Sequence, residues 1–524
     1  MHWARWGDPD HDEPLSASAR GLVEAAFGPV AESPAVAVED VHLPERGLPD
    51  EALRAFETAV GAEHVLLDRR ARLLHTRGKS TPDLLRIRSG DGSDAPDAVL
   101  RPADHDQVVA VTQVCRRHRV ALVPFGGGTS VVGGLSARRD GFAGVVAVDV
   151  GRLDRLVSVD EESGTAVLEA GLLGPQAERL LAEHRLTLGH FPQSFEYASI
   201  GGFAATRSSG QASSGYGRFD ALVMGLRVAT PIGTLELGSA PASAAGPDLR
   251  ELVLGSEGAF GIITSCTVRV RPLPALRVYE GWRLESFAEG ATAVRRLAQS
   301  GANPTVLRLS DETETSVNLA DPDAVGGDSA GGSMLLAGYE GEQTCVDAMR
   351  SRVRDKLTAL GGASLGEAPG RAWAEGRFHG PYLRDALLDV GVLVETLETA
   401  TFWSRLQKVY ADVKAALEAS LGEQGAPAIV LCHISHVYET GASLYFTVAA
   451  KELADPLAQW AAAKTAASEA IVGAGATITH HHGVGRDHKP WLAAEIGEVG
   501  VEILRAVKHR IDPEGVLNPG VLVP

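Results

Sequence analysis

A glycine-rich stretch at residues 124–130 directly follows an apolar run that is typical of a buried strand. The stretch reads Pro-Phe-Gly-Gly-Gly-Thr-Ser, and the run before it is Val120–Val123. Because glycine has no Cβ, this backbone can approach a ligand closely, and its successive N–H groups can bind an anion such as a pyrophosphate. Thr129 and Ser130 add hydroxyl donors. The stretch lacks the spacing of known nucleotide loops, so taken alone a simple turn between strands explains it equally well.

Two further clusters of small residues occur downstream. Residues 199–210 read Ser-Ile-Gly-Gly-Phe-Ala-Ala-Thr-Arg-Ser-Ser-Gly, and residues 255–263 form a turn that feeds an apolar strand at 262–270. The first cluster would let a flat ring lie against the backbone, with hydroxyls as hydrogen-bond partners, although a tight surface loop is the alternative. Three such clusters near strand ends predict a large phosphate-bearing cofactor with a ring system.

The C-terminal half contains a triple histidine, His480-His481-His482, and two isolated candidates, Tyr445 and Arg405. Three histidines suggest a metal site, but neighbours on a strand point to opposite faces, so only His480 and His482 would share one. A structural role is the alternative for each histidine. Tyr445 lies in an apolar strand, where a core ring is more common than a catalyst. Arg405 near a helix start could simply pair with a glutamate.

The elements that must position these residues point to an α+β protein with several domains. Residues 1–91 are predicted to be mainly helical, with a helix at 50–60 that begins after Pro49. From residue 98 to 272, strands and helices alternate. The predicted strands are 98–101, 120–123, 145–149, 166–170 and 262–270, and the predicted helices are 104–118 and 174–184.

The second half continues the alternation. A loop at 326–332 is expected to be flexible from its glycine content. The helices predicted here are 342–360, 403–421 and 454–472, and the strands are 428–432 and 443–449. We therefore expect a helical region at 1–91, a cofactor domain at 92–273 and a cap domain at 274–425. Residues 426–524 are expected to form the C-terminal part of the cap and of the active site and then to return to the cofactor domain.

Composition excludes several classes of protein. The chain has 524 residues, 44% of them hydrophobic, and a net charge of −18, which argues against nucleic acid or a broad anionic membrane surface as partner. No run of about 18 apolar residues occurs. The polar N-terminus does not resemble a signal peptide, and four scattered cysteines are expected to be free, buried thiols in a reducing cytoplasm.

Residues 124–130, 199–202 and 257–263 together resemble the vanillyl-alcohol-oxidase-type FAD-binding family. The resemblance implies non-covalently bound FAD and a two-subdomain, PCMH-type flavin domain beside an α/β cap. Two branches of this family compete. One is alkyldihydroxyacetonephosphate synthase (alkylglycerone-phosphate synthase), and the other comprises the FAD-dependent D-2-hydroxyacid dehydrogenases of the glycolate and D-lactate type.

The histidine segment separates these branches. Similar dehydrogenases carry a Gly-Glu-His-Gly segment and a Gly-Asp-Gly-Asn-Leu-His segment that hold a metal, but here His481 stands in place of the glutamate and Tyr445 in place of the histidine. Tyrosine is a poor ligand at neutral pH, so no metal is expected. The triple histidine, Tyr445 and the segment Trp3–Gly7 all resemble the synthase branch.

The resemblance also implies roles for single residues. Tyr445 would transfer protons, with His481 and His482 beside it and the flavin. His480 and His190 would be further catalytic residues. Arg405 and Arg308 would bind the substrate, Arg405 through its phosphate. Gln193 departs from the aspartate usual in the family, and Phe446–Val448 is less aromatic than usual. The expected FAD-binding residues are Pro124, Phe125, Gly126, Gly127, Gly128, Thr129, Ser130, Gln193, Ser194, Ser199, Gly201, Gly202, Thr206, Arg207, Ser208, Ser209, Glu257, Gly258, Gly261, Ile262 and Ile263.

The implied reaction exchanges the acyl group of acyl-dihydroxyacetone phosphate for a fatty alcohol. The alternative is dehydrogenation of a small hydroxyacid, and a flavin-binding protein without turnover is the third hypothesis. Residues 371–390 would be an amphipathic helix or a mobile gate that touches lipid. The expected partners are a phosphorylated lipid or small-acid substrate and a second copy in a homodimer; no nucleic acid is expected, and peripheral membrane contact is allowed.

Overall fold

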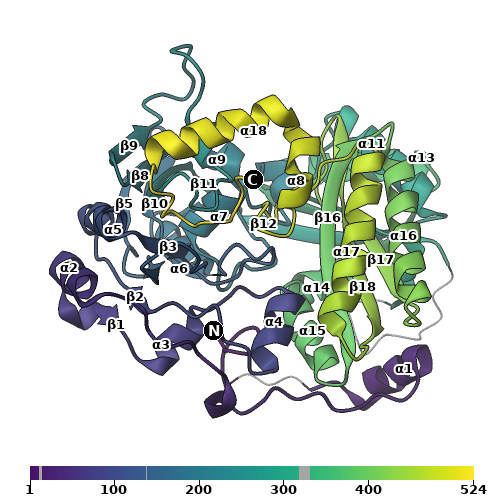
Figure 1. The fold of residues 1–524 in the computed structure, drawn as a ribbon. Coiled ribbons are helices and arrows are strands. Elements are labelled where there is room, and N and C mark those ends of the chain that lie inside the picture. The colour runs from purple at the N-terminus through teal and green to yellow at the C-terminus, as the bar shows by residue number, and fades with distance from the viewer. Residues whose placement is uncertain (11–13, 137, 318–330) are drawn as a thin grey trace.

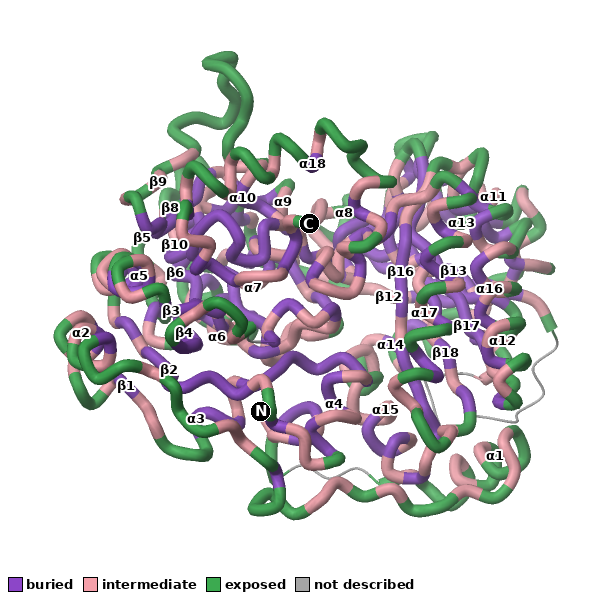
Figure 2. Tube along the Cα trace, viewed as in Figure 1, coloured by how far each residue is buried: buried purple, intermediate pink, exposed green. Residues whose placement is uncertain are grey.

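The computed structural model describes residues 1–10, 14–136, 138–317 and 331–524. Two bodies stand side by side in Figure 1: one half has two small sheets, and the other is built on one large sheet. We call the first the flavin half, because it contains the segments at 124–130, 199–210 and 255–263 that are predicted to bind FAD. Figure 2 shows that the strands of both halves are mostly buried. Within the described residues, no helix is long and apolar enough to cross a membrane.

The N-terminal region is mainly helical, as predicted, but it also contributes a strand. The predicted helix at 50–60 is confirmed as α2, and β1 pairs with β2 through Val65 and Leu100. The part with α2 and β1 therefore joins the flavin half, whereas α1 and α4 contact the cap, so the region is not a separate unit. Its elements are α1 Ala17–Phe27, η1 Val38–Asp40, α2 Asp50–Val60, η2 Ala62–His64, β1 Val65–Leu66, α3 Arg69–Leu74 and α4 Thr81–Arg88.

The first sheet of the flavin half has the order β1-β2-β4-β3. Its inner strands pair in parallel, and each carries the continuous apolar run expected of a strand buried on both faces. The helix α5 covers it and packs against α2. The bounds are β2 Ala98–Leu100, α5 His105–His118, β3 Val120–Phe125 and β4 Gly144–Asp149.

The second sheet is antiparallel, in the order β5-β6-β10-β8-β9, and a short pair, β7 with β11, lies beside it. The strands are β5 Leu156–Asp160, β6 Thr165–Glu169, β7 Leu186–Thr187, β8 Val223–Thr230, β9 Gly233–Leu237, β10 Ile262–Arg269 and β11 Arg271–Pro272. The helices are α6 Gly174–Ala182, α7 Ile200–Thr206, α8 Ser213–Tyr216, α9 Phe219–Leu222 and α10 Arg250–Val253.

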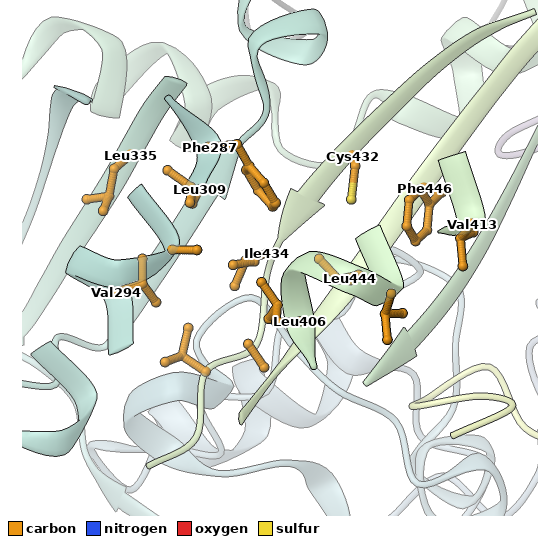
Figure 3. Packing of buried hydrophobic residues seen from close by; sticks show 14 of the residues in the cluster. Phe287, Val294, Leu309, Leu335, Leu406, Val413, Cys432, Ile434, Leu444 and Phe446 are labelled. Carbon is orange, nitrogen blue, oxygen red and sulfur yellow. The ribbon is translucent and has the colours of Figure 1, made fainter. Parts of the chain in front are cut away.

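A seven-stranded antiparallel sheet in the order β15-β12-β14-β13-β17-β18-β16 forms the cap. Apolar side chains alternate along its strands and pack against helices; Figure 3 shows Cys432, Ile434, Leu444 and Phe446 near Leu406 and Val413. The strands are β12 Leu276–Leu284, β13 Val306–Ser310, β14 Ser333–Gly341, β15 Ala363–Gly366, β16 Val392–Phe402, β17 Ile429–Ile434 and β18 Gly441–Lys451. The helices are α11 Phe287–Gln299, α12 Glu312–Val317, α13 Gln343–Ala359, α16 Leu406–Glu423 and α17 Pro456–Gly473.

The cap differs from the sequence prediction at residues 371–390. Two helices, α14 Ala368–Gly376 and α15 Gly380–Leu388, replace the single amphipathic helix that was expected. Pro381 explains the break, because proline suits the first turn of a helix but cannot lie in its interior. Most of the predicted flexible loop at 326–332 lies outside the described residues.

The C-terminus returns to the flavin half, as expected. The helix α18, Leu492–Ile511, follows the short turn η4 at Lys489–Trp491, and Leu517 forms a bridge with Leu122 of β3. Figure 1 shows α18 lying over the flavin-half strands. All four cysteines are free, but Cys345 is exposed, so the prediction of four buried thiols was wrong for that residue.

Candidate functional site

A cavity of about 1230 Å³ opens between the flavin half and the cap sheet. The three glycine-rich clusters contribute to its wall, and the same wall includes the cap residues Tyr445, His481 and His482. Of the expected FAD-binding residues, all but Arg207 line the cavity. The structure therefore brings segments that are far apart in sequence to one site.

The glycine loop after β3 is packed so closely that side chains would not fit. A Cβ at Gly127 would overlap the Tyr197 carbonyl oxygen, and one at Gly126 would overlap the Ser199 hydroxyl. The Ser130 hydroxyl is buried and has no hydrogen-bond partner in the described part of the chain. Buried polar groups are normally hydrogen-bonded, so this cradle has room and donors for a pyrophosphate. The residues present fit FAD.

The second cluster, residues 199–210, begins with a helix and is not a surface loop. Ser199 caps α7 by accepting from the Gly202 N–H at 3.2 Å, and Gly201 allows the helix to lie against Ala170 next to β6. Arg207 points away from the cavity, because its guanidinium pairs with Asp220 at 3.1 Å and Glu251 at 2.7 Å. Its assignment to FAD binding is corrected to a structural role.

Three functional side chains form a row across the cap sheet. Tyr445 on β18 pairs in register with Glu398 on β16 and with His433 on β17. Directly opposed residues of antiparallel strands share one face, and the intervening residues Cys432 and Phe446 point into the core on the other face. The Tyr445 ring stacks on His433 with a centroid separation of 4.9 Å.

Two buried carboxylates hold the loop at 480–485 in place. Glu398 accepts from the backbone N–H groups of His480 at 2.6 Å, His481 at 3.1 Å and His482 at 3.0 Å. Glu257, at the flavin side, accepts from the N–H groups at positions 484 and 485, at 2.9 and 2.7 Å. These contacts fix the histidine loop between the cap and the flavin half. Glu257 lines the cavity, but its carboxylate is hydrogen-bonded to this loop.

The bend in this loop changes which histidines act together. On a strand only His480 and His482 would share a face, but the segment is not a strand. His481 and His482 line the cavity together with Tyr445, which agrees with the place that the family resemblance implied for them. His480 lies behind them, with its Nε2 2.5 Å from the Tyr438 hydroxyl and its Nδ1 3.0 Å from Nδ1 of His481. This arrangement would let His480 exchange a proton with His481.

Burial determines the protonation of the cluster formed by Tyr445, His481, His482 and Glu398, which we call the centre. It lowers the pKa of His481 and lowers the pKa of His482 to about 3, so both imidazoles are neutral at pH 7. Burial raises the pKa of Tyr445 to about 12, which keeps the phenol protonated. Burial alone would raise the pKa of Glu398, but the neighbouring imidazoles and the Thr479 hydroxyl hold it well below its ordinary value. The centre thus has a proton donor beside neutral acceptors.

A further histidine, His436, joins the cluster from the loop after β17. Single ligand atoms of His436, His480 and His481 all lie within 4.8 Å of one another, a spacing that a small cation could also use. The Nδ1 atom of His436 is buried without a hydrogen-bond partner among the described residues. The sequence analysis expected no metal, and it did not include His436 among the candidate site residues.

Two other predicted residues lie outside the cavity wall. His190 is buried between Phe203 and Phe219, with Nε2 3.0 Å from the Ser208 hydroxyl, and burial lowers its pKa to about 3. Arg405 is exposed at the start of α16 and donates to the Gly475 carbonyl at 2.9 Å. The structure therefore corrects His190 to a supporting role and does not bring Arg405 to the site.

Arg308 does line the cavity, as predicted. Its Nη2 lies 2.7 Å from Glu314 and 3.0 Å from Nδ1 of His433. Sequence reasoning missed Glu398, His433 and Glu314. A signal existed for Glu398, because a carboxylate inside the strand at 392–402, whose residues are mostly buried, needs a buried partner.

One branch of the cavity wall is apolar. On the sheet face that carries Tyr445, the next rows toward the far end are Thr396 with Thr447 and then Val394 with Ala449. Successive rows on this face are roughly 7 Å apart. The far end is covered by α1 and by Leu15 just before it. Val23 and Phe27 of α1 and Leu15 pack against the strand residues Val392 and Val394.

Comparisons with known proteins agree with this geometry. Residues 96–238 match the family model described as FAD binding domain, and residues 273–522 match FAD linked oxidases, C-terminal domain. The FAD-binding and α+β predictions are therefore confirmed. Solved structures of 4-ethylphenol oxidase and p-cresol methylhydroxylase, at 14% and 17% identity with TM-scores of 0.71 and 0.68, share the fold.

Higher similarity is found to one group of enzymes. Alkyldihydroxyacetonephosphate synthase of Dictyostelium discoideum is 34% identical, over 94% of this chain and 84% of that protein, and the Trypanosoma brucei brucei enzyme is 34% identical over 88% and 79%. A solved structure of an alkyldihydroxyacetonephosphate synthase matches with a TM-score of 0.86 at 31% identity, covering 100% of this chain and 99% of that one. The chain belongs to the FAD-dependent alkyldihydroxyacetonephosphate synthase family.

Proposed function

We propose that this protein exchanges the acyl group of acyl-dihydroxyacetone phosphate for a fatty alcohol and so makes an ether lipid precursor. The observation that carries the proposal is the apolar branch of the cavity, which runs from Tyr445 past Val394 and Ala449 to α1. A long hydrocarbon chain would fill this branch, because burying apolar surface is favourable. A small hydroxyacid would leave it empty.

The chemistry of the exchange is redox-neutral overall. The bond between the substrate carbon and the acyloxy oxygen breaks, the fatty acid leaves with that oxygen, and the alcohol oxygen bonds to the same carbon. The proton of the alcohol passes to a base. When bound, FAD supplies a ring that takes up and returns an electron pair within one turnover, so that no external acceptor is consumed.

The residues of the centre fit the proton transfers that this exchange needs. Neutral His481 and His482 accept protons, and the Tyr445 hydroxyl donates one to the departing group or takes part in the reverse step. Glu398 fixes both histidines through their backbone N–H groups without touching the substrate. We also propose that α1, at the far end of the apolar branch, is where lipid enters and where the protein contacts a membrane surface.

An anaerobic incubation tests the proposal. The holoenzyme is mixed with acyl-dihydroxyacetone phosphate and an isotopically labelled long-chain alcohol, and the products are analysed by mass spectrometry. Labelled ether product in the absence of an electron acceptor is the expected result. No ether product, together with bleaching of the flavin by a D-2-hydroxyacid, would move the assignment to the dehydrogenase alternative.

A further inference from the structure

A second pocket, of about 420 Å³, lies apart from the cavity and is lined mainly by charged side chains. Two of these are neutralised within the protein: Arg139 lies 2.8 Å from Asp97, and Asp94 lies 2.9 Å from Arg77. The remaining acidic residue, Asp140, is exposed. Among the described residues, no carboxylate forms an ion pair with the three other basic groups, which are Arg138, Arg486 and Lys489.

The three basic groups converge on Gly520. The Lys489 ammonium donates to the Gly520 carbonyl at 2.8 Å. A Cβ at Gly520 would lie 3.5 Å from Nη1 of Arg138 and 3.7 Å from Nε of Arg486. Gly520 has a φ of +88°, a conformation that residues with side chains rarely adopt. The point on which the basic groups converge is therefore kept free of a side chain.

Arg486 and Lys489 are held by backbone carbonyls, which do not neutralise their charge. Nη2 of Arg486 donates to the Ser136 carbonyl at 2.6 Å, but its Nε is buried without an acceptor among the described residues. Buried donors are normally hydrogen-bonded. Burial and the neighbouring guanidinium groups of Arg138 and Arg486 lower the pKa of Lys489. These like charges repel one another, and a bound anion would relieve the repulsion.

We propose that this pocket binds the phosphate group of a small soluble anion, such as a phosphomonoester. Guanidinium groups match the geometry of phosphate oxygens, and the Lys489 ammonium adds a third positive charge. The whole chain has a net charge of −18, so this cluster is a local exception that would select for an anion. The inference does not depend on the proposed function, because the pocket shares no lining residue with the cavity.

A lipid headgroup has the same phosphate chemistry, but the position of the pocket favours a soluble ligand. Gly520 is close to the C-terminus, which Figure 1 shows beside α18, whereas α1 lies at the lower right. A membrane in contact with α1, as proposed above, would not reach the pocket. Arg486 directly follows the histidine loop, so a bound anion would join this loop to Arg138 of the flavin half.

Tungstate, a tetrahedral dianion like phosphate, locates the site directly. Crystals of the holoenzyme are soaked with tungstate, and the tungsten position is found by anomalous diffraction. We expect tungstate within hydrogen-bond distance of Arg138, Arg486 and Lys489. Tungstate found only in the cavity, or only as an adventitious ion elsewhere on the surface, would overturn the proposal.

Isothermal titration calorimetry of the holoenzyme with inorganic pyrophosphate tests the site in solution. Arg138→Glu should weaken binding on the order of 10- to 100-fold, because it reverses one of the three charges. Arg117→Glu is the matched control: Arg117 is exposed on α5 of the same half, does not line the pocket, and gives the same change in net charge. Wild-type affinity in Arg138→Glu, or an equal loss in both variants, would overturn the site.

Vesicles distinguish the two sources of phosphate. Wild type and Arg138→Glu are sedimented with phosphatidylcholine vesicles that contain phosphatidic acid. Pyrophosphate binding together with vesicle sedimentation that does not depend on Arg138 supports a soluble ligand. Sedimentation that depends on Arg138, without pyrophosphate binding, would overturn that assignment in favour of a headgroup. Flavin content verifies folding, and Arg138→Gln decides the matter if the glutamate variant does not fold.

Discussion

The candidate FAD cradle and the proposed catalytic centre face the same cavity but are built in opposite ways. The cradle, residues 124–130, is one contiguous stretch whose glycines leave the backbone bare, and its fit depends on the absence of side chains at Gly126 and Gly127. The centre depends on side chains from three strands and one loop, held by the buried carboxylates Glu398 and Glu257. Added atoms would disturb the cradle, whereas the loss of a carboxylate that accepts from the histidine loop would disturb the centre.

This difference means that cofactor binding and turnover can be broken separately. Glu398 contacts the histidine loop and not the glycine loop, so its loss should leave flavin in place. Glu257 is the exception, because it lines the cavity and also accepts from the Gly485 N–H.

The largest effect is expected for Tyr445→Phe. Removing the hydroxyl deletes the proton donor but keeps the ring that stacks on His433, so turnover should fall roughly 10²- to 10⁴-fold with flavin retained. The measurement is ether product per bound flavin. Loss of flavin in this variant would instead make Tyr445 part of the cradle.

Glu398→Gln should lower turnover on the order of 10- to 100-fold. The amide cannot accept from all the N–H groups of the loop at 480–482, so the histidines lose their fixed positions. Steady-state kinetics measure the turnover, and flavin absorbance measures the amount of bound flavin. Glu340→Gln is the control, since this buried carboxylate accepts from Tyr216 and Tyr279. Equal loss of flavin and activity in Glu398→Gln would remove the distinction between the two regions.

Gly127→Ala tests the close packing of the cradle. The new methyl group would overlap the Tyr197 carbonyl, and such overpacking costs about 1–3 kcal/mol. We expect flavin affinity to fall roughly tenfold or more, as measured by flavin retained on dialysis. Gly422→Ala, at a site with open space around it, should retain the wild-type flavin content. A fully loaded Gly127→Ala protein would contradict the close approach of backbone and cofactor.

Ala449→Phe should change chain-length preference by several-fold. The ring would fill the apolar branch beside Val394, so long alcohols should lose more activity than short ones. Competition between alcohols of different length, followed by mass spectrometry, measures the ratio. An unchanged ratio would place the hydrocarbon elsewhere.

The smallest change is expected from pH. Because burial lowers the pKa of His482 to about 3 and raises that of Tyr445 to about 12, neither group titrates near neutrality. The acid limb should therefore lie below the ordinary histidine value, and turnover should stay constant between roughly pH 7 and pH 9. A bell-shaped profile of turnover against pH centred near 7 would show that an imidazole in the centre is more exposed to water than the structure indicates.

The sequence alone determined the local features of this protein. Its apolar runs predicted β3 and β4, helical spacing predicted α2 and α5, and the three small-residue clusters predicted the cradle, because each of these depends on neighbours within a few residues. The resemblance of 124–130, 199–202 and 257–263 to FAD-binding proteins supplied the cofactor. Of the residues expected to bind FAD, Arg207 is the one turned away from the cavity, toward Asp220.

Only the tertiary structure determined which side chains form the proposed catalytic centre and which partners the charged residues have. Strand register, which no local pattern reveals, places Glu398 beside Tyr445 and His433. A bend, where a strand was expected, turns His481 and His482 to the cavity together. The same holds for Arg405, which is exposed and donates to the Gly475 carbonyl, because the partners that folding brings to a side chain do not show in its neighbours along the sequence.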